Sequence, residues 1–247
     1  MAPHHAAARF LAVLGVTPFV SVLVLPPMIL GNDKAPLLTF STTAATTATN
    51  RSALVAEHLA AGLVLLTPAT FLLHFYASTT LRGGRSAGAI GGGRLSYARA
   101  FFRAAAGLAG GWAALHALAV LFGAPLAALA WPTALWALLA ATLSAMPSAV
   151  LLGTRTGAWA RLYGGARAPR AAWRHLREWV VAPPAFGAVV GSWAGAWLVP
   201  LDWDRPWQTH PLPGVYGALV GHGVACAWAA CACWRGDVGS ANAKKVT

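Results

Sequence analysis

The sequence predicts an all-α polytopic membrane protein with about six transmembrane helices and both termini in the cytoplasm. Of its 247 residues, 57% are hydrophobic and only 10% are charged, against about 45–50% and about 25% in soluble domains. The apolar residues fall into runs of about 20, the length that crosses a hydrocarbon core of roughly 30 Å. The basic residues gather on alternate connecting segments. These three observations define the fold class.

The apolar runs predict six spans that form a single membrane-embedded helical domain over residues 1–247. The first run follows Arg9 and so resembles a signal peptide. Its length, its prolines at 18, 26 and 27 and the lack of a convincing cleavage site favour an uncleaved helix. We expect the spans near residues 10–30, 53–77, 100–122, 132–153, 180–199 and 212–234.

The basic residues orient these spans. All but three of the 18 Lys and Arg residues lie in the N-terminal segment, the 78–103 segment, the 154–178 segment and the C-terminal tail. The three exceptions are Lys34, Arg51 and Arg205. Positively charged segments stay in the cytoplasm, so both termini are expected there, in agreement with an even number of spans.

The formal charge of +12 also invites a nucleic-acid interpretation, because basic patches attract phosphate. The basic residues lie between apolar runs, where orientation signals belong, so we expect no nucleic-acid partner. Cys226, Cys231 and Cys233 all lie in the last apolar run, which argues against a disulfide framework. We expect no cofactor and no metal site.

Ionisable residues inside the spans are candidates for function, since they are costly in a bilayer. Glu57 and His58 lie in the second span, near its non-cytoplasmic end. The structural alternative is an interfacial carboxylate that pairs with Arg51 or with His58. The remaining intramembrane histidines lack metal-ligand spacing, and we expect each to form hydrogen bonds between helices; they are His74, His116 and His222.

Glycines at a spacing of four residues predict close helix packing in the last two spans. Such faces let helix backbones approach each other where lipid supplies no hydrophobic driving force. The pattern leaves open whether the two spans pack on each other or on a partner. The glycines are Gly187, Gly191 and Gly195 in the fifth span and Gly217 and Gly221 in the sixth.

The connection between these spans is unusually rich in charged and aromatic residues. Tryptophan is typical of the headgroup level, and proline stiffens a chain. One interpretation is an interfacial turn with an internal Asp–Arg pair, and the other is a rigid surface that binds a partner. The residues concerned are Pro200, Asp202, Trp203, Asp204, Arg205, Pro206 and Trp207.

The chain ends in Lys244-Lys245-Val246-Thr247. Lysines three and four positions from the C-terminus match the dilysine retrieval signal of endoplasmic-reticulum membrane proteins. The predicted orientation places this tail in the cytosol, where such a signal is read.

Two stretches of the chain form a recognisable pattern. One runs from Gly195-Ala196-Trp197-Leu198 through Pro200 to Gln208, and the other is Leu121-Phe122-Gly123-Ala124-Pro125-Leu126 followed by Pro147 and Leu151-Leu152-Gly153. Together they resemble the PIG-F family of glycosylphosphatidylinositol (GPI) anchor biosynthesis. The resemblance implies a small endoplasmic-reticulum membrane protein that binds and stabilises the large phosphoethanolamine transferases acting on GPI mannoses. It places catalysis in the partner, whose lumenal domain carries the metals.

The residues themselves are compatible with a helper role. The non-cytoplasmic face offers few acid–base or metal-binding groups, too sparse for the two-metal site that phosphoryl transfer uses: Asp33, Glu57, His58, Asp202, Asp204 and His210. An alternative hypothesis is a membrane-embedded lipid-handling enzyme or carrier that uses Glu57 and the intramembrane histidines. A solute transporter is a third, although the chain shows no convincing internal repeat of the kind transporters often have.

Overall fold

A computed structural model of the chain describes residues 3–24, 48–80, 92–125, 127–153, 157, 159–160, 176–201 and 206–235. Every regular element within these ranges is helical. The long helices are α1 (Pro3–Phe19), α3 (Ala48–Thr80), α4 (Gly92–Leu121), α5 (Ala130–Leu143), α6 (Ala145–Leu152), α9 (Leu176–Ala196) and α10 (Leu212–Arg235). A π-helical turn, η1 (Val20–Val24), continues α1, and a 3₁₀ turn, η3 (Pro206–Gln208), precedes α10.

The described helices supply six segments long and apolar enough to cross a membrane, which confirms the predicted fold class. Helices α5 and α6 together form one of them, with Ser144 between. The first of these segments begins at His4, and the expected single membrane-embedded domain with its span bounds stays a prediction. The segments are His4–Val24, Ser52–Thr80, Tyr97–Leu121, Ala130–Leu152, Leu176–Ala196 and Leu212–Trp234.

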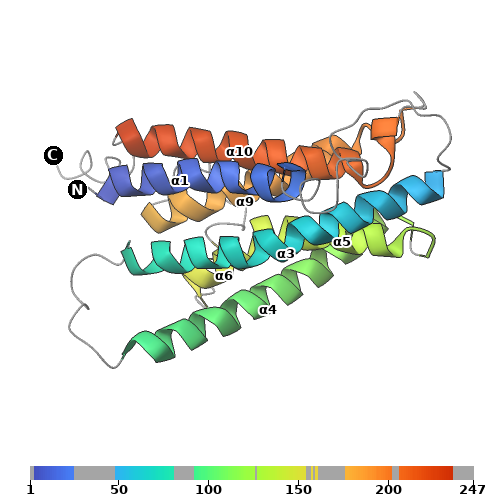
Figure 1. Ribbon diagram of the computed structural model, residues 1–247. Helices are drawn as coiled ribbons and strands as arrows, with labels where there is room; N and C mark the ends of the chain where they lie inside the picture. Colours follow the sequence, from blue (N-terminus) through green and yellow to red (C-terminus); the bar gives the residue numbers. More distant parts are fainter. Residues whose placement is uncertain are drawn as a thin grey trace.

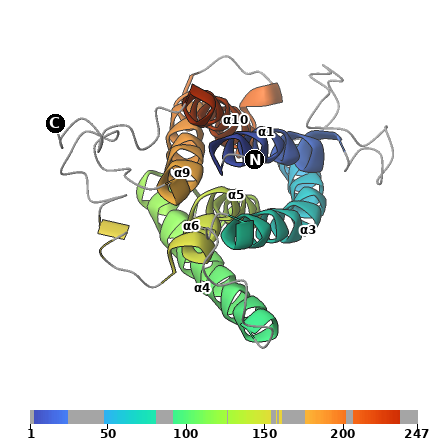
Figure 2. The ribbon, with the colours of Figure 1, turned by 90° about the vertical axis from the view of Figure 1, so that its left-hand side faces the viewer.

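The helices form a bundle with one helix on its outer side. Seen end-on, α10, α1, α3, α5, α6 and α9 surround a common interior, and α4 lies outside them (Figure 2). Helix α4 packs mainly on α5 and α6, and only 11% of its span is buried, against 78% of the span formed by α5 and α6. The most extensive helix pairs are α9 with α10 and α1 with α10.

The first turn of α1 and the last turn of α10 lie at the same end of the bundle (Figure 1). The rings of His5 and Trp234 meet there with centroids 4.9 Å apart. This arrangement follows from an even number of spans. The cytoplasmic location of that end stays a prediction of the charge distribution.

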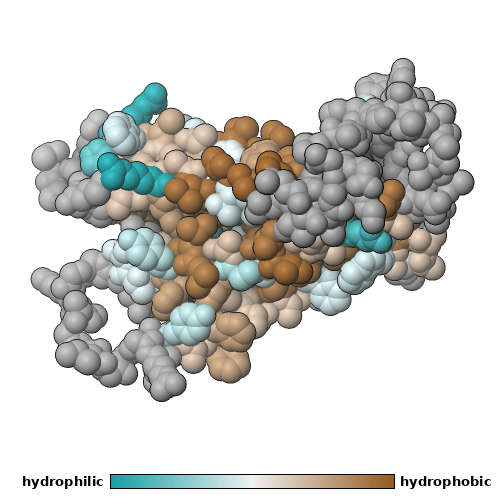
Figure 3. All heavy atoms as spheres, in the orientation of Figure 1, coloured by the Kyte–Doolittle hydropathy of each residue, from teal (hydrophilic) through white to brown (hydrophobic). Residues whose placement is uncertain are grey.

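Apolar side chains cover the middle of the face drawn in Figure 3. The interior is also mainly apolar and includes Leu11, Leu59, Leu139 and Leu219, each 0% exposed. Lipid tails are as apolar as these side chains, so van der Waals packing and close backbone approach hold the helices together.

The intramembrane histidines differ in their contacts. Nδ1 of His222 on α10 donates to the carbonyl oxygen of Pro184 on α9 at 3.2 Å, an interhelical bond of the predicted kind. Nδ1 of His74 instead donates to the carbonyl oxygen of Thr70 in its own helix at 2.8 Å. The ring of His116 lies beside that of Trp112, with centroids 6.0 Å apart.

Candidate functional site

The five glycines predicted to pack helices face one another across α9 and α10. A Cβ atom added at Gly191 would meet the backbone carbonyl oxygen of Gly217, and one added at Gly187 would meet that of Gly221. One added at Gly195 would meet the carbonyl oxygen of Pro213. The obstructing atoms belong to backbone, so no side-chain rotation makes room for a larger residue. The last two spans therefore pack on each other along this glycine seam, a choice that the sequence left open.

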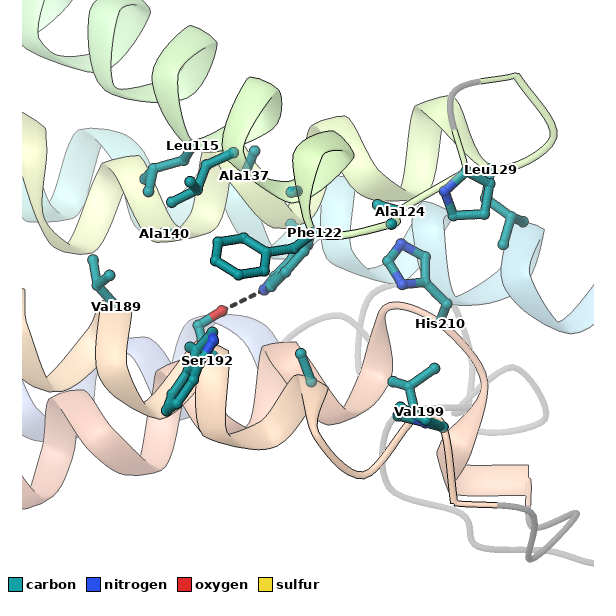
Figure 4. Close-up of a pocket in the computed structure, with 18 residues that line it drawn as sticks. Leu115, Phe122, Ala124, Leu129, Ala137, Ala140, Val189, Ser192, Val199 and His210 are labelled. Carbon is teal, nitrogen blue, oxygen red and sulfur yellow. Dashed lines mark hydrogen bonds between the residues drawn. The ribbon is translucent and has the colours of Figure 1, made fainter.

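Helix α9, which packs on α10 along this seam, forms one wall of a groove. The groove lies at the end of the bundle opposite the first turn of α1. The groove has a volume of about 530 Å³ and lies between α4 and α9, with α5 as its floor (Figure 4). Its polar groups are the Ser192 hydroxyl, the His210 imidazole and the indole N–H groups of Trp136 and Trp193, and aromatic rings contribute to its walls. It is lined by Leu115, Leu118, Ala119, Phe122, Gly123, Ala124, Pro125, Leu129, Trp136, Ala137, Ala140, Val189, Ser192, Trp193, Ala196, Val199, Pro200 and His210.

Trp136 connects three helices beneath this groove. From α5, its indole N–H donates to Oγ of Ser192 on α9 at 2.6 Å (Figure 4). The ring lies against Gly214 on α10, where an added Cβ would be 2.8 Å from the indole. It also meets the ring of His210 edge-on, with centroids 5.9 Å apart. A tryptophan whose N–H is satisfied and whose ring fills a gap between helices makes a rigid floor.

His210 lies at the groove end beyond the spans, between η3 and α10. Its Nε2 is 2.9 Å from Oγ1 of Thr133, and the Thr133 hydroxyl already donates to the carbonyl oxygen of Leu129 at 2.8 Å. A hydroxyl carries a single proton, so the network assigns the donated proton to Nε2 of His210 and leaves Nδ1 as an acceptor. Burial lowers the pKa of His210, which favours this neutral form at pH 7.

The connection between α9 and α10 is anchored at both ends. The backbone N–H groups of Leu198 and Val199 donate to the carbonyl oxygens of Gly195 and Ala196 at 3.0 and 3.1 Å. Nε2 of Gln208 in η3 donates back to the carbonyl oxygen of Leu198 at 3.0 Å and also to that of Leu201. The predicted Asp–Arg pair lies outside the described residues, as do Asp202, Trp203, Asp204 and Arg205 individually.

With this geometry in place, comparison with known proteins identifies the family. The GPI biosynthesis protein family Pig-F matches residues 37–230. The chain belongs to the PIG-F family. That match confirms the resemblance found in the sequence, and it takes in both the glycine seam and the groove.

The similar proteins include curated members of this family. The chain is 36% identical over 107 residues to the stabilizing subunit of GPI ethanolamine phosphate transferase of Homo sapiens, an alignment that covers 43% of this chain and 47% of that protein. It is 36% identical over 110 residues to glycosylphosphatidylinositol anchor biosynthesis protein 11 of Aspergillus fumigatus. That alignment covers 44% of this chain and 34% of that protein. The alignments span about half the length of these relatives or less, and no solved structure matches the chain.

The polar residues predicted in the second span leave α3 in different directions. His58 is 0% exposed, and its Nδ1 donates to the carbonyl oxygen of Leu54 at 3.0 Å, whereas Glu57 is exposed. The structure does not gather Glu57 with His74, His116 or His222, and within the described ranges no three His, Cys, Asp or Glu side chains come together as a metal site. Lys244 and Lys245 lie outside those ranges.

Sequence reasoning missed the groove and the role of Trp136. His210 was noted only as one of several groups on the non-cytoplasmic face, and Ser192 and Trp136 carried no motif. Trp136 and Ser192 lie 56 residues apart in the sequence, and His210 lies in a third segment, so no local pattern could have joined them.

Proposed function

We propose that this PIG-F family member is a non-catalytic stabilising subunit of a GPI ethanolamine phosphate transferase in the endoplasmic-reticulum membrane. In that role it supports transfer of phosphoethanolamine to GPI mannoses by a large catalytic partner. The observation that carries the proposal is the family match together with the human relative, which is named as a stabilizing subunit.

The distribution of chemical groups supports a partner that performs the chemistry. Phosphoryl transfer requires charges placed around the phosphate and a held nucleophile. The side chains that line the groove are mostly apolar, and none of them is an acid, a lysine or an arginine. A bundle of this kind suits a scaffold better than a reaction centre.

We propose the Pro200–Gln208 connection as the surface that meets the lumenal part of the partner. Its described ends are held by the hydrogen bonds of Gln208 and of the turn after α9, and these ends would lose little conformational entropy on docking. Tryptophan and arginine are the residues that most often anchor interfaces, and this connection carries Trp203, Arg205 and Trp207.

Alanine at Trp203 or Arg205 is therefore expected to release the partner. Truncating such an anchor costs about 2 kcal/mol or more of binding free energy, which corresponds to a loss of association of roughly thirtyfold. The measurement is co-purification of the transferase with the tagged chain, normalised to the amount of the chain itself. Trp131→Ala is the matched control, because Trp131 is a 63% exposed tryptophan at the start of α5, and it is expected to leave association unchanged.

An opposite result would come from a catalytic role for the acids of this connection. Asp202→Ala or Asp204→Ala would then leave an intact, correctly located complex that transfers no phosphoethanolamine. That outcome would contradict the stabilising role and would favour chemistry at these carboxylates.

Orientation and location can be tested together with one glycan. The native Asn50-Arg51-Ser52 triplet is itself an acceptor sequence, so Asn50→Gln removes it and a new Asn-x-Thr acceptor is placed near residue 40. The charge distribution predicts that this site faces the lumen and is modified, and that the glycan stays sensitive to endoglycosidase H.

With Lys244→Ser and Lys245→Ser we expect part of the glycan to become resistant to endoglycosidase H when the partner is absent. An unmodified acceptor would contradict the orientation, and complete sensitivity in the dilysine variant would contradict the retrieval signal.

A further inference from the structure

The groove between α4 and α9 runs from the ends of two spans toward the middle of the membrane. Its lining includes residues from Val189 to Ala196 on α9 and from Leu115 to Ala119 on α4, and it continues into the turns that follow both helices. At a rise of 1.5 Å per residue the helical stretches are about 10 Å and about 6 Å long, less than half of a hydrocarbon core of roughly 30 Å. Both walls belong mostly to candidate membrane spans, so the groove begins at the interface and stays within one leaflet.

The size and lining of the groove restrict what fills it. The groove has a volume of about 530 Å³, which accommodates a single flexible hydrocarbon chain. Such a chain is much narrower than a helix, which is about 10–12 Å across with its side chains. Water is a poor occupant, because it needs two to four polar partners and most of the lining side chains are apolar.

The outer end of the groove carries a hydrogen-bond acceptor on His210. Nε2 of His210 donates to Thr133, and Nδ1 is left as an acceptor with no hydrogen-bond partner among the described residues. Such an acceptor at the interface favours a headgroup that carries an N–H donor over one that carries none. Among abundant bilayer lipids, phosphatidylethanolamine has such a donor and phosphatidylcholine does not.

We infer that this groove binds one acyl chain of a bilayer lipid, with the headgroup region donating a hydrogen bond to Nδ1 of His210. The chain lies against Ala137 and Ala140 on the floor, between the α4 and α9 walls. Every lining residue belongs to this chain, so binding to the groove can be measured without a transferase.

Photolabelling of the full-length chain tests this site. The protein is reconstituted in vesicles of equal phosphatidylethanolamine and phosphatidylcholine, with a trace of either lipid carrying a diazirine near the middle of one acyl chain. We expect labelled peptides from residues 115–122 and 189–199, with roughly tenfold more label from the ethanolamine probe because a donor with charge strengthens the hydrogen bond.

Two pairs of variants separate the groove from the rest of the lipid-facing surface. Val189→Trp fills the groove from α9 and is expected to abolish labelling of both peptides. Val190→Trp is the control, because Val190 is 56% exposed and lies outside the groove. We expect the Val190→Trp chain to be labelled like the natural chain. His210→Phe should make the two probes label equally. Leu115→Trp repeats the block from the α4 wall in case Val189→Trp unfolds.

Contrary results are equally defined. Unchanged labelling in folded Val189→Trp and Leu115→Trp chains would overturn the acyl-chain site. An ethanolamine preference that survives in His210→Phe would overturn the headgroup contact. Both results are read from the isolated chain, without the partner or the transfer reaction.

Discussion

Replacing Gly191 with leucine is expected to separate α9 from α10 and to prevent the folded chain from accumulating. Even the first atom of a side chain at this position would collide with the carbonyl oxygen of Gly217. Both atoms belong to helices whose packing forms the most extensive contact in the bundle. Overpacking costs typically about 1–3 kcal/mol where side chains can adjust, and here only separation of two backbones relieves the collision. We expect a loss of at least about 3 kcal/mol, a large fraction of a typical stability of about 5–15 kcal/mol.

Gly110 provides the matched control for this substitution. It lies in the middle of α4, and an added Cβ would meet nothing within 4 Å. Gly110→Leu is therefore expected to leave unfolding unchanged or to stabilise the helix by about 0.5–1 kcal/mol, since glycine is a poor helix former. Thermal unfolding in detergent and the steady-state level of each variant are the measurements. Equal stability of the two leucine variants would show that α9 and α10 do not pack through these glycines.

Trp136→Ala is expected to produce the second large effect, a collapse of the groove floor. The substitution removes the ring that lies against Gly214, the hydrogen bond to Ser192 and the edge contact with His210. Large-to-small changes at tryptophan typically cost about 3–5 kcal/mol when the residue is buried. Trp136 is partly buried, so we expect about 3 kcal/mol together with loss of any ligand held in the groove.

Two further variants divide this effect into its parts. Ser192→Ala keeps the ring and removes only the acceptor of the indole N–H, a loss of about 1 kcal/mol. Trp131→Ala removes an exposed tryptophan from the same helix, and surface substitutions of this kind usually stay within about 0.5 kcal/mol. If Trp136→Ala proved no more harmful than Trp131→Ala in thermal unfolding, Trp136 would not connect the three helices.

The candidate site shows where sequence reasoning stopped. The seam glycines were identified from their spacing, but their partners were not. The spacing of Gly187, Gly191 and Gly195 describes one face of one helix, and the register that sets Gly191 against Gly217 is a relation between two helices. Glu57 and His58, adjacent in sequence, looked like a pair, yet one is exposed and the other is fully buried. Neighbouring residues of a helix point about 100° apart because a turn holds 3.6 residues.

The sequence by itself determined the all-helical membrane class, the number of spans and the family. Each of these depends on local composition: an apolar run of about 20 residues must cross the bilayer as a helix, because lipid satisfies no backbone hydrogen bonds. Only the tertiary structure decided that α9 packs on α10, that α4 lies on the outside, and that Trp136, Ser192 and His210 meet at one groove. Lipid is as apolar as the helix faces, so hydropathy does not distinguish a face that meets lipid from one that meets another helix. Shape complementarity between distant segments makes that distinction.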